Sequence, residues 1–136
     1  MPRALVIDDD DAIREMVALT LEASGFDVAR ARGARDARRE LETARPDVIL
    51  CDIYMPGGDG LSVLREVQAR PAPPPVILMT ARGSVETAAA AEETGAFDYL
   101  AKPFDVSVLL DRVSAALAAR PAGHTPAEDG PESMIV

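Results

Sequence analysis

Five polar residues that could do chemistry together each stand where an apolar run ends. Asp8 and Asp9 follow the first run, and Asp52, Thr80 and Lys102 follow three later ones. The carboxyl ends of neighbouring strands in an open parallel sheet meet at one edge, where such folds place their ligand sites. If the apolar runs are parallel strands, three carboxylates, a hydroxyl and an ammonium group therefore converge.

This group of side chains is suited to binding a divalent cation and a phosphoryl group. Two carboxylates about 4 Å apart repel each other by roughly 4 kcal/mol at an effective dielectric constant near 20. One lysine cannot neutralise three acids, whereas Mg²⁺ binds a few carboxylates and keeps several waters. A magnesium ion beside a lysine and a hydroxyl favours phosphoryl chemistry. The sequence has no GxxxxGK phosphate loop, so covalent attachment to a carboxylate is the favoured alternative to a bound nucleotide.

Lys102 is distinctive because it is the only lysine among 14 cationic residues, the other 13 being arginine. Lysine and arginine are not interchangeable at a tight site, since the ammonium is compact and flexible. Its retention in an arginine-biased chain indicates a specific requirement.

The elements that must position these residues follow a regular alternation. Short apolar segments at residues 4–7, 26–29, 48–51, 76–79 and 97–100 are predicted to be strands. Val48–Cys51 is continuously apolar, as expected for a strand that is buried on both faces of a parallel sheet. Each strand is followed by a helical pattern, which predicts an α/β fold with right-handed crossovers. A doubly wound, flavodoxin-like sheet of order 2-1-3-4-5 is one common solution.

Apolar residues at helical spacing predict the five helices. The apolar stripe of the first helix is Ile13, Met16, Val17, Thr20 and Leu21, and Gly25 is predicted to end this helix. The stripe of the second helix is Ala34, Ala37, Leu41 and Ala44, and that of the third is Leu61, Leu64 and Val67 or Gln68. The fourth helix is predicted to run from a Ser84 cap through Thr94, and the fifth to follow a cap at Asp105 with the stripe Val106, Leu109, Leu110, Val113 and Leu117. Arg35, Arg38 and Arg39 are predicted to lie on a solvated face of the second helix.

Composition limits the classes of function. The chain has 136 residues and a net charge of −9, which argues against direct contact with nucleic acid. No apolar run is long enough to predict a membrane span, and the N-terminus does not read as a signal peptide. The only cysteine, Cys51, is predicted to be a buried core residue, and a reducing cytoplasm is the expected location.

Four segments in this order are similar to the motifs of bacterial two-component response-regulator receiver domains of the CheY-like kind. They are Val6–Asp9, Asp52–Gly60, Met79–Ala81 and Gly95–Phe104. The resemblance covers about residues 3–120, and we take residues 1–120 as the receiver domain. Residues 121–136 are rich in proline, glycine and charge, which predicts a flexible linker or tail.

The resemblance implies that Asp52 accepts a phosphoryl group from a phosphohistidine of a sensor histidine kinase. It further implies that Asp8, Asp9, Asp52 and the Tyr54 backbone carbonyl bind Mg²⁺. Lys102 would pair with the phosphoryl oxygens and precede a cis bond to Pro103.

The resemblance also assigns a conformational switch to Thr80 and Tyr99. On phosphorylation, the two side chains would change the face built from the helix at 84–94, the strand at 97–100 and the final helix. Because Thr80 can donate to the phosphoryl group only in the phosphorylated state, it supplies the differential contact that a population shift requires. Homodimerisation through this face is the expected consequence. Gly58, where relatives often carry a larger residue, predicts a loose loop after Asp52.

Two rival functions remain open from the sequence. Haloacid-dehalogenase-like phosphatases also use an aspartate nucleophile, Mg²⁺, a threonine and a lysine, and Asp8-Asp9-Asp10 offers an Asp-x-Asp. However, the threonine that usually follows that motif and an acidic pair after Lys102 are missing. The other rival is a receiver-like module that signals without phosphorylation.

The expected output is control of transcription. Gly95–Leu100 and Pro131–Val136 are similar to segments of NtrC-like regulators, in which an ATPase domain and a DNA-binding domain follow. The chain is then a piece of a longer protein. A stand-alone regulator with a loose tail is the alternative.

Overall fold

The computed structural model describes residues 1–53, 55, 60–80 and 95–119, and within them a five-stranded parallel sheet. The strands are β1 (Arg3–Ile7), β2 (Asp27–Ala31), β3 (Val48–Asp52), β4 (Val76–Thr80) and β5 (Asp98–Ala101). Their order is β2-β1-β3-β4-β5, so the predicted flavodoxin-like topology is confirmed. β3 and β4 are buried along their whole length, as the continuous apolar pattern predicted.

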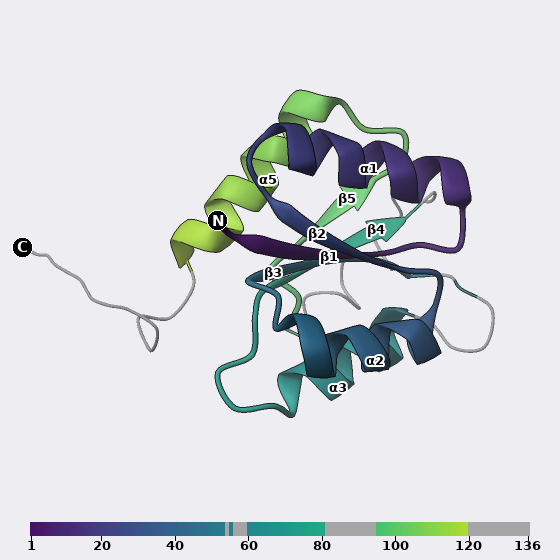
Figure 1. The fold of residues 1–136 in the computed structure, drawn as a ribbon, viewed down its shortest axis with the longest axis vertical. Coiled ribbons are helices and arrows are strands. Elements are labelled where there is room, and N and C mark those ends of the chain that lie inside the picture. The colour runs from purple at the N-terminus through teal and green to yellow at the C-terminus, as the bar shows by residue number, and fades with distance from the viewer. Residues whose placement is uncertain (54, 56–59, 81–94, 120–136) are drawn as a thin grey trace, which may run out of the picture.

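Four described helices cover the two faces of the sheet. They are α1 (Asp11–Ala23), α2 (Ala34–Ala44), α3 (Gly60–Gln68) and α5 (Val106–Ala119). In Figure 1, α1 and α5 lie on one side of the sheet and α2 and α3 on the other. The predicted fourth helix and the predicted tail at 121–136 lie outside the described residues.

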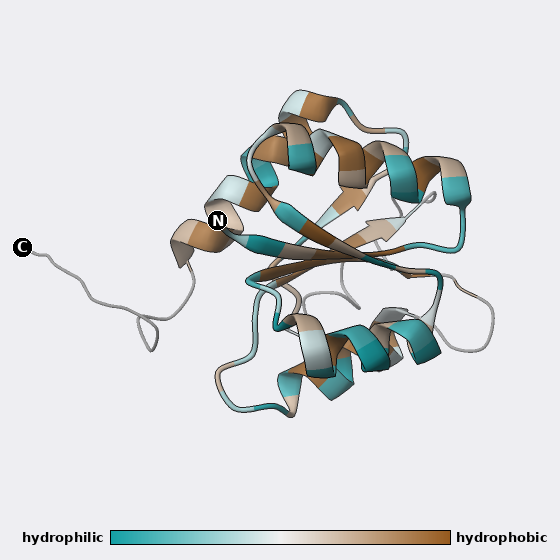
Figure 2. Ribbon diagram, viewed as in Figure 1, coloured by the Kyte–Doolittle hydropathy of each residue, from teal (hydrophilic) through white to brown (hydrophobic). Residues whose placement is uncertain are grey.

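Alternating strand residues divide the core between the two faces. Leu5 and Ile7 of β1 pack with the α2 and α3 side, whereas Ala4 and Val6 pack with the α1 and α5 side. Figure 2 shows this as hydrophobic strands between helices that carry hydrophilic residues outward. Because both faces are covered, the sheet holds its strand ends in a rigid frame.

Several sequence-based boundaries were wrong by one or two residues. β2 begins at Asp27 and extends to Ala31, and β5 begins at Asp98. Phe97, predicted to start β5, is 38% exposed. The prediction missed the end of β2 because Arg30 is polar, yet its guanidinium pairs with Glu15 and Glu22 of α1.

The buried stripe of α1 was also partly mispredicted. Met16, predicted to be buried, is 40% exposed. The buried residues of α1 are Arg14, Val17, Ala18 and Leu21. By contrast, the exposed positions of Arg35, Arg38 and Arg39 on α2 and the buried position of Cys51 are confirmed. Gly25 follows α1 with a φ of 95°, which fits its predicted role as a stop.

Arg38 of α2 forms a bidentate ion pair with Glu66 of α3, with N–O distances of 2.7 and 2.8 Å. The Arg38 hydrogen bond holds the pKa of the Glu66 carboxyl below its usual value. A carboxyl with a lowered pKa in the folded state stabilises the fold above its unfolded-state pKa, and this contribution is lost as the pH falls through the folded-state pKa.

We therefore expect Glu66→Gln to lower the urea midpoint slightly at pH 7, since exposed ion pairs contribute little. The difference between the variant and the parent should shrink at an acidic pH below the lowered folded-state pKa of Glu66, where the parent carboxyl is neutral. Urea unfolding at both pH values, with Glu42→Gln on the exposed face of α2 as the control, measures it. An equal difference at both pH values would contradict the prediction.

The helices in the described part of the chain are all too short or too polar to cross a bilayer.

Candidate phosphoacceptor and metal site

Asp8, Asp9 and Asp52 meet at the carboxyl edge of the sheet. One oxygen of each carboxylate lies within 4.8 Å of those of the other two. β1 and β3 are neighbours with Ile7 opposite Cys51, so the residues that follow them come together. Asp8 is fully buried and Asp52 is 6% exposed, whereas Asp9 is exposed. The predicted three-carboxylate cluster is therefore present, open to solvent on the Asp9 side.

Lys102 directs its ammonium group into this cluster. Its Nζ lies 2.7 Å from Asp8 Oδ2 and 3.6 Å from Asp52 Oδ1. The side chain is 12% exposed, so the charge is largely removed from water. The Lys102–Pro103 bond is cis, as the resemblance implied. The lysine that composition singled out is thus the cation that contacts the two buried carboxylates.

Thr80 ends β4 and is fully buried. Its carbonyl accepts a hydrogen bond of 2.6 Å from the Lys102 backbone N–H. In the register of the sheet, Asp52 pairs with Met79, and Thr80 pairs with Ala101. Thr80 therefore stands one residue beyond the partner of Asp52 and beside the end of β5, which Lys102 directly follows.

Tyr99 lies on β5, away from the carboxylates. It is half-buried and packs against the core on the α2 and α3 side. It also lines a groove between β5 and α5, at the side of which Arg112 pairs with Asp98 at 2.9 Å. A half-buried aromatic residue with a polar tip can occupy two environments, which the predicted switch requires.

The donor set fits a hard divalent cation. All three side chains offer carboxylate oxygens, which Mg²⁺ and Ca²⁺ prefer over nitrogen or sulfur. Asp9 leaves the cluster accessible to water and to an incoming group. Tyr54, whose backbone carbonyl was the fourth predicted ligand, and Gly58, in the predicted loose loop, lie outside the described residues.

Sequence reasoning missed one residue at this site, Arg14. It is 8% exposed, and its Nη1 donates to the Asp8 carbonyl oxygen at 3.0 Å. Helical periodicity could not find it, because an arginine counts as polar in such a pattern. Its spacing of three residues from Asp11, the usual spacing of a helical ion pair, was the available signal.

Comparison with known proteins agrees with this geometry. A family model described as the response regulator receiver domain matches residues 4–114. The chain belongs to the response-regulator receiver-domain family. The predicted family, and its signalling role in two-component systems, are confirmed.

Curated relatives include transcriptional regulators. The chain is 43% identical over 107 residues to the regulatory protein AtoC of Escherichia coli K12, covering 79% of this chain and 23% of AtoC. It is 40% identical over 112 residues to the transcriptional regulator NtrC of Klebsiella pneumoniae, covering 80% of this chain and 24% of NtrC. It is 42% identical over 124 residues to the transcriptional regulatory protein PrrA of Mycobacterium leprae, covering 91% of this chain and 53% of PrrA. The receiver domain thus spans between a quarter and about half of these relatives.

Solved structures of receiver domains have the same fold. The chemotaxis response regulator CheY4 of Vibrio cholerae superimposes with a TM-score of 0.80 at 32% identity, covering 86% of this chain and 99% of CheY4. A CheY-like receiver domain protein from Methanospirillum hungatei JF-1 gives a TM-score of 0.82 at 28% identity, covering 88% of this chain and 96% of that one.

Proposed function

We propose that this receiver domain accepts a phosphoryl group on Asp52 from a sensor histidine kinase in a Mg²⁺-dependent reaction. The observation that carries the proposal is the contact of the Lys102 ammonium with Asp8 and Asp52 at the edge where three carboxylates meet. Of the two buried carboxylates, Asp52 has the longer and weaker contact with Lys102. Lys102 therefore contacts both the proposed phosphoacceptor and a proposed metal ligand.

Asp8, Asp9 and Asp52 would hold the magnesium ion, together with the Tyr54 carbonyl. When bound, Mg²⁺ supplies charge stabilisation to the transferring phosphoryl oxygens. The carboxylates contribute a fixed geometry, because Asp8 and Asp52 extend from rigid buried strands. Lys102 contributes a positive charge at the position where the negative charge of the phosphoryl group arrives.

In the transfer step, a carboxylate oxygen of Asp52 attacks the phosphorus of the phosphohistidine. The P–O bond to Asp52 forms as the P–N bond breaks, and the imidazole nitrogen leaves with the bonding electron pair. The new acyl phosphate adds close to two negative charges and three acceptor oxygens. After the transfer, Lys102 pairs with the phosphoryl oxygens. This contact takes the place of its contact with the free Asp52 carboxylate.

The Thr80 hydroxyl is proposed to donate to the phosphoryl group, and Tyr99 to turn inward in response. Both residues lie near or on β5, so the change reaches the surface of β5 and α5 through adjoining backbone. A ligand shifts a two-state equilibrium only through contacts that differ between the states, and the Thr80 hydrogen bond is such a contact. Homodimerisation on this face and control of transcription in the cytoplasm complete the proposal, with AtoC, NtrC and PrrA as regulators of the expected kind.

Incubation with acetyl phosphate and Mg²⁺, followed by intact-mass measurement, tests the proposal. The parent should gain one phosphoryl group that is stable in acid and labile in base. Asp52→Asn should gain none, whereas the control Asp111→Asn, on an exposed part of α5, should behave as the parent. Stoichiometric gain persisting in Asp52→Asn would refute the assignment. No gain in the parent would favour a module that works without phosphorylation, and sustained phosphomonoester turnover would favour a phosphatase.

Magnesium is expected to raise the midpoint of thermal unfolding. A ligand that binds only the folded state adds about 1.4 kcal/mol at ten times its Kd. Asp8→Asn should remove most of this increment, because it removes a buried ligand oxygen. Differential scanning calorimetry with Mg²⁺, with EDTA and with NaCl at matched ionic strength measures the effect. An equal increment in Asp8→Asn and the parent would contradict the placement of the ion.

A further inference from the structure

Arg14 is unusual because it is a charged residue on the buried face of α1. It is 8% exposed and shares that face with Val17, Ala18 and Leu21. Arginine is rarely buried unless its guanidinium is paired, since removing an unpaired charge from water is costly. The contacts that compensate this burial show what the residue holds.

The guanidinium of Arg14 joins the two ends of the segment Asp8–Asp11. Nη1 donates to the Asp8 carbonyl oxygen at 3.0 Å, and Nη2 donates to Asp11 Oδ1 at 2.6 Å. Asp11 is therefore the counter-charge of Arg14. The planar fork of arginine suits such a double contact, and a lysine ammonium cannot reproduce its geometry.

The carbonyl that Arg14 holds belongs to the peptide that joins Asp8 to Asp9. The Asp8 residue is fixed on its other sides, since its N–H donates to the Ala31 carbonyl at 3.1 Å and its Oδ1 accepts from the Asp10 N–H at 2.9 Å. Among the described residues, no hydrogen bond or ion pair holds the Asp9 side chain. The direction of Asp9 therefore depends on the orientation of the peptide that Arg14 clamps.

We propose that Arg14 is a positioning residue for the metal and phosphoryl site, acting through the Asp8–Asp9 peptide to keep the Asp9 carboxylate in the cluster. This inference rests on the proposed function, because it concerns the same magnesium ion. Arg14 touches neither the cluster carboxylates nor the phosphoryl position.

The charge of Arg14 has a weaker effect on the metal than its geometry. A bare cation near the cluster would oppose Mg²⁺, so its removal would strengthen binding. However, Asp11 neutralises Arg14 locally at 2.6 Å. The loss of Asp9 orientation therefore outweighs the removal of charge, and the net effect of removing Arg14 is weaker metal binding.

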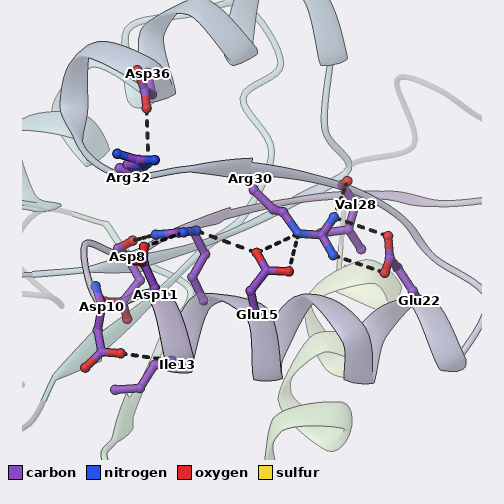
Figure 3. Close-up of polar contacts among 11 residues, drawn as sticks. Asp8, Asp10, Asp11, Ile13, Glu15, Glu22, Val28, Arg30, Arg32 and Asp36 are labelled. Atoms are coloured by element: carbon purple, nitrogen blue, oxygen red, sulfur yellow. Dashed lines mark hydrogen bonds and ion pairs between the residues drawn. The ribbon is translucent and has the colours of Figure 1, made fainter.

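Arg30 of β2 provides a matched control, because its guanidinium also pairs with acidic residues of α1. Figure 3 shows it beside Glu15 and Glu22 of α1, away from Asp8 and Asp11. Its Nε lies 2.9 Å from Glu15 and its Nη2 3.1 Å from Glu22. Arg30→Met removes the same charge and also breaks ion pairs to α1, yet leaves the Asp8–Asp11 segment in place.

The test compares Arg14→Met, Arg14→Lys and Arg30→Met by calorimetric Mg²⁺ titration, with folding confirmed by circular dichroism. Loss of an outer contact to a metal ligand typically weakens metal binding by about 10- to 100-fold, and we expect Arg14→Met to fall in that range. Arg14→Lys keeps the charge but should recover only part of the affinity. Arg30→Met should stay within about twofold of the parent, because it touches no residue of the site.

A second measurement separates positioning from a general loss of stability. The initial rate of acetyl phosphate labelling in Arg14→Met should be low at limiting Mg²⁺ and return most of the way at saturating Mg²⁺. A Kd in folded Arg14→Met equal to that of the parent, or an equal loss in Arg30→Met, would overturn the inference. If Arg14→Met does not fold, Arg14→Lys and Asp11→Asn decide, and parental affinity in both would overturn it. Failure of the parent to bind Mg²⁺ would instead refute the proposed function.

Discussion

Lys102→Met is expected to lower the free energy of unfolding by about 3–5 kcal/mol, the usual cost of removing one partner of a buried ion pair. Asp8 is fully buried and has its Oδ2 2.7 Å from the Lys102 ammonium. Without that ammonium, the Asp8 carboxylate would remain buried beside Asp52 with no cation between them. Urea unfolding in EDTA measures the loss.

The same variant should bind Mg²⁺ more tightly than the parent while losing its phosphorylation. In the parent, the ammonium competes with the metal for the charge of Asp8 and Asp52, so its removal favours the metal. The phosphoryl oxygens, however, lose their counter-charge in the transition state, and loss of such a donor commonly slows a reaction by about 100-fold or more. Calorimetric Mg²⁺ titration measures the expected gain in metal affinity, and acetyl phosphate labelling measures the expected loss of phosphorylation in the same variant.

Lys102→Arg is the informative companion variant. It keeps the positive charge, so most of the stability should return, but the bulky planar guanidinium does not fit the place of a compact ammonium. We expect labelling to remain well below that of the parent. Parental stability in Lys102→Met, or parental labelling in Lys102→Arg, would mean that the lysine is not the cation that the site requires.

The positions of Asp52 and Lys102 could be predicted because they depend on topology more than on detail. Once alternating strands and helices indicate a parallel sheet, residues that follow adjacent strands must meet at one edge. The family resemblance then added the proposed roles of Thr80 and Tyr99, which alternation of strands and helices alone does not suggest.

Two of the errors arose where a charged side chain is partly or fully buried against its partner. Arg30 was excluded from β2 because it is charged, although Glu15 and Glu22 neutralise it on the surface of α1. Arg14 was assigned no role, although it occupies the buried stripe in place of Met16. Hydropathy periodicity treats each residue alone, so it cannot detect a charge whose burial depends on a partner elsewhere in the fold. Both missed residues, Arg14 and Arg30, are arginines whose charge is paired with acidic residues of α1.

Gly60→Ala is expected to destabilise the domain and to disturb Asp52 together. Gly60 begins α3, and its N–H donates to the Ile53 carbonyl at 2.6 Å. A Cβ atom there would overlap the Asp52 carbonyl oxygen and would lie 2.9 Å from Ile53 Cα. These obstacles are backbone atoms, so no change of rotamer relieves them. Either the start of α3 or the end of β3 must move.

Overpacking of a fixed site usually costs about 1–3 kcal/mol, and we expect Gly60→Ala at the upper end of that range. Because the overlapping backbone belongs to Asp52 itself, labelling by acetyl phosphate should fall beyond what partial unfolding explains. Both effects are measured at a temperature where circular dichroism shows the variant to be folded.

Gly25→Ala is the matched control, since it also adds one methyl group to a glycine but does so far from the site. Gly25 has a φ of 95°, and a Cβ there meets nothing within 4 Å. Its cost is therefore backbone strain alone, about 1–2 kcal/mol, with no effect on labelling. If the two variants lose similar stability but only Gly60→Ala loses labelling, the end of β3 has moved. Full labelling in folded Gly60→Ala would mean that α3 gives way instead, and that the position of Asp52 does not depend on the close approach of this helix.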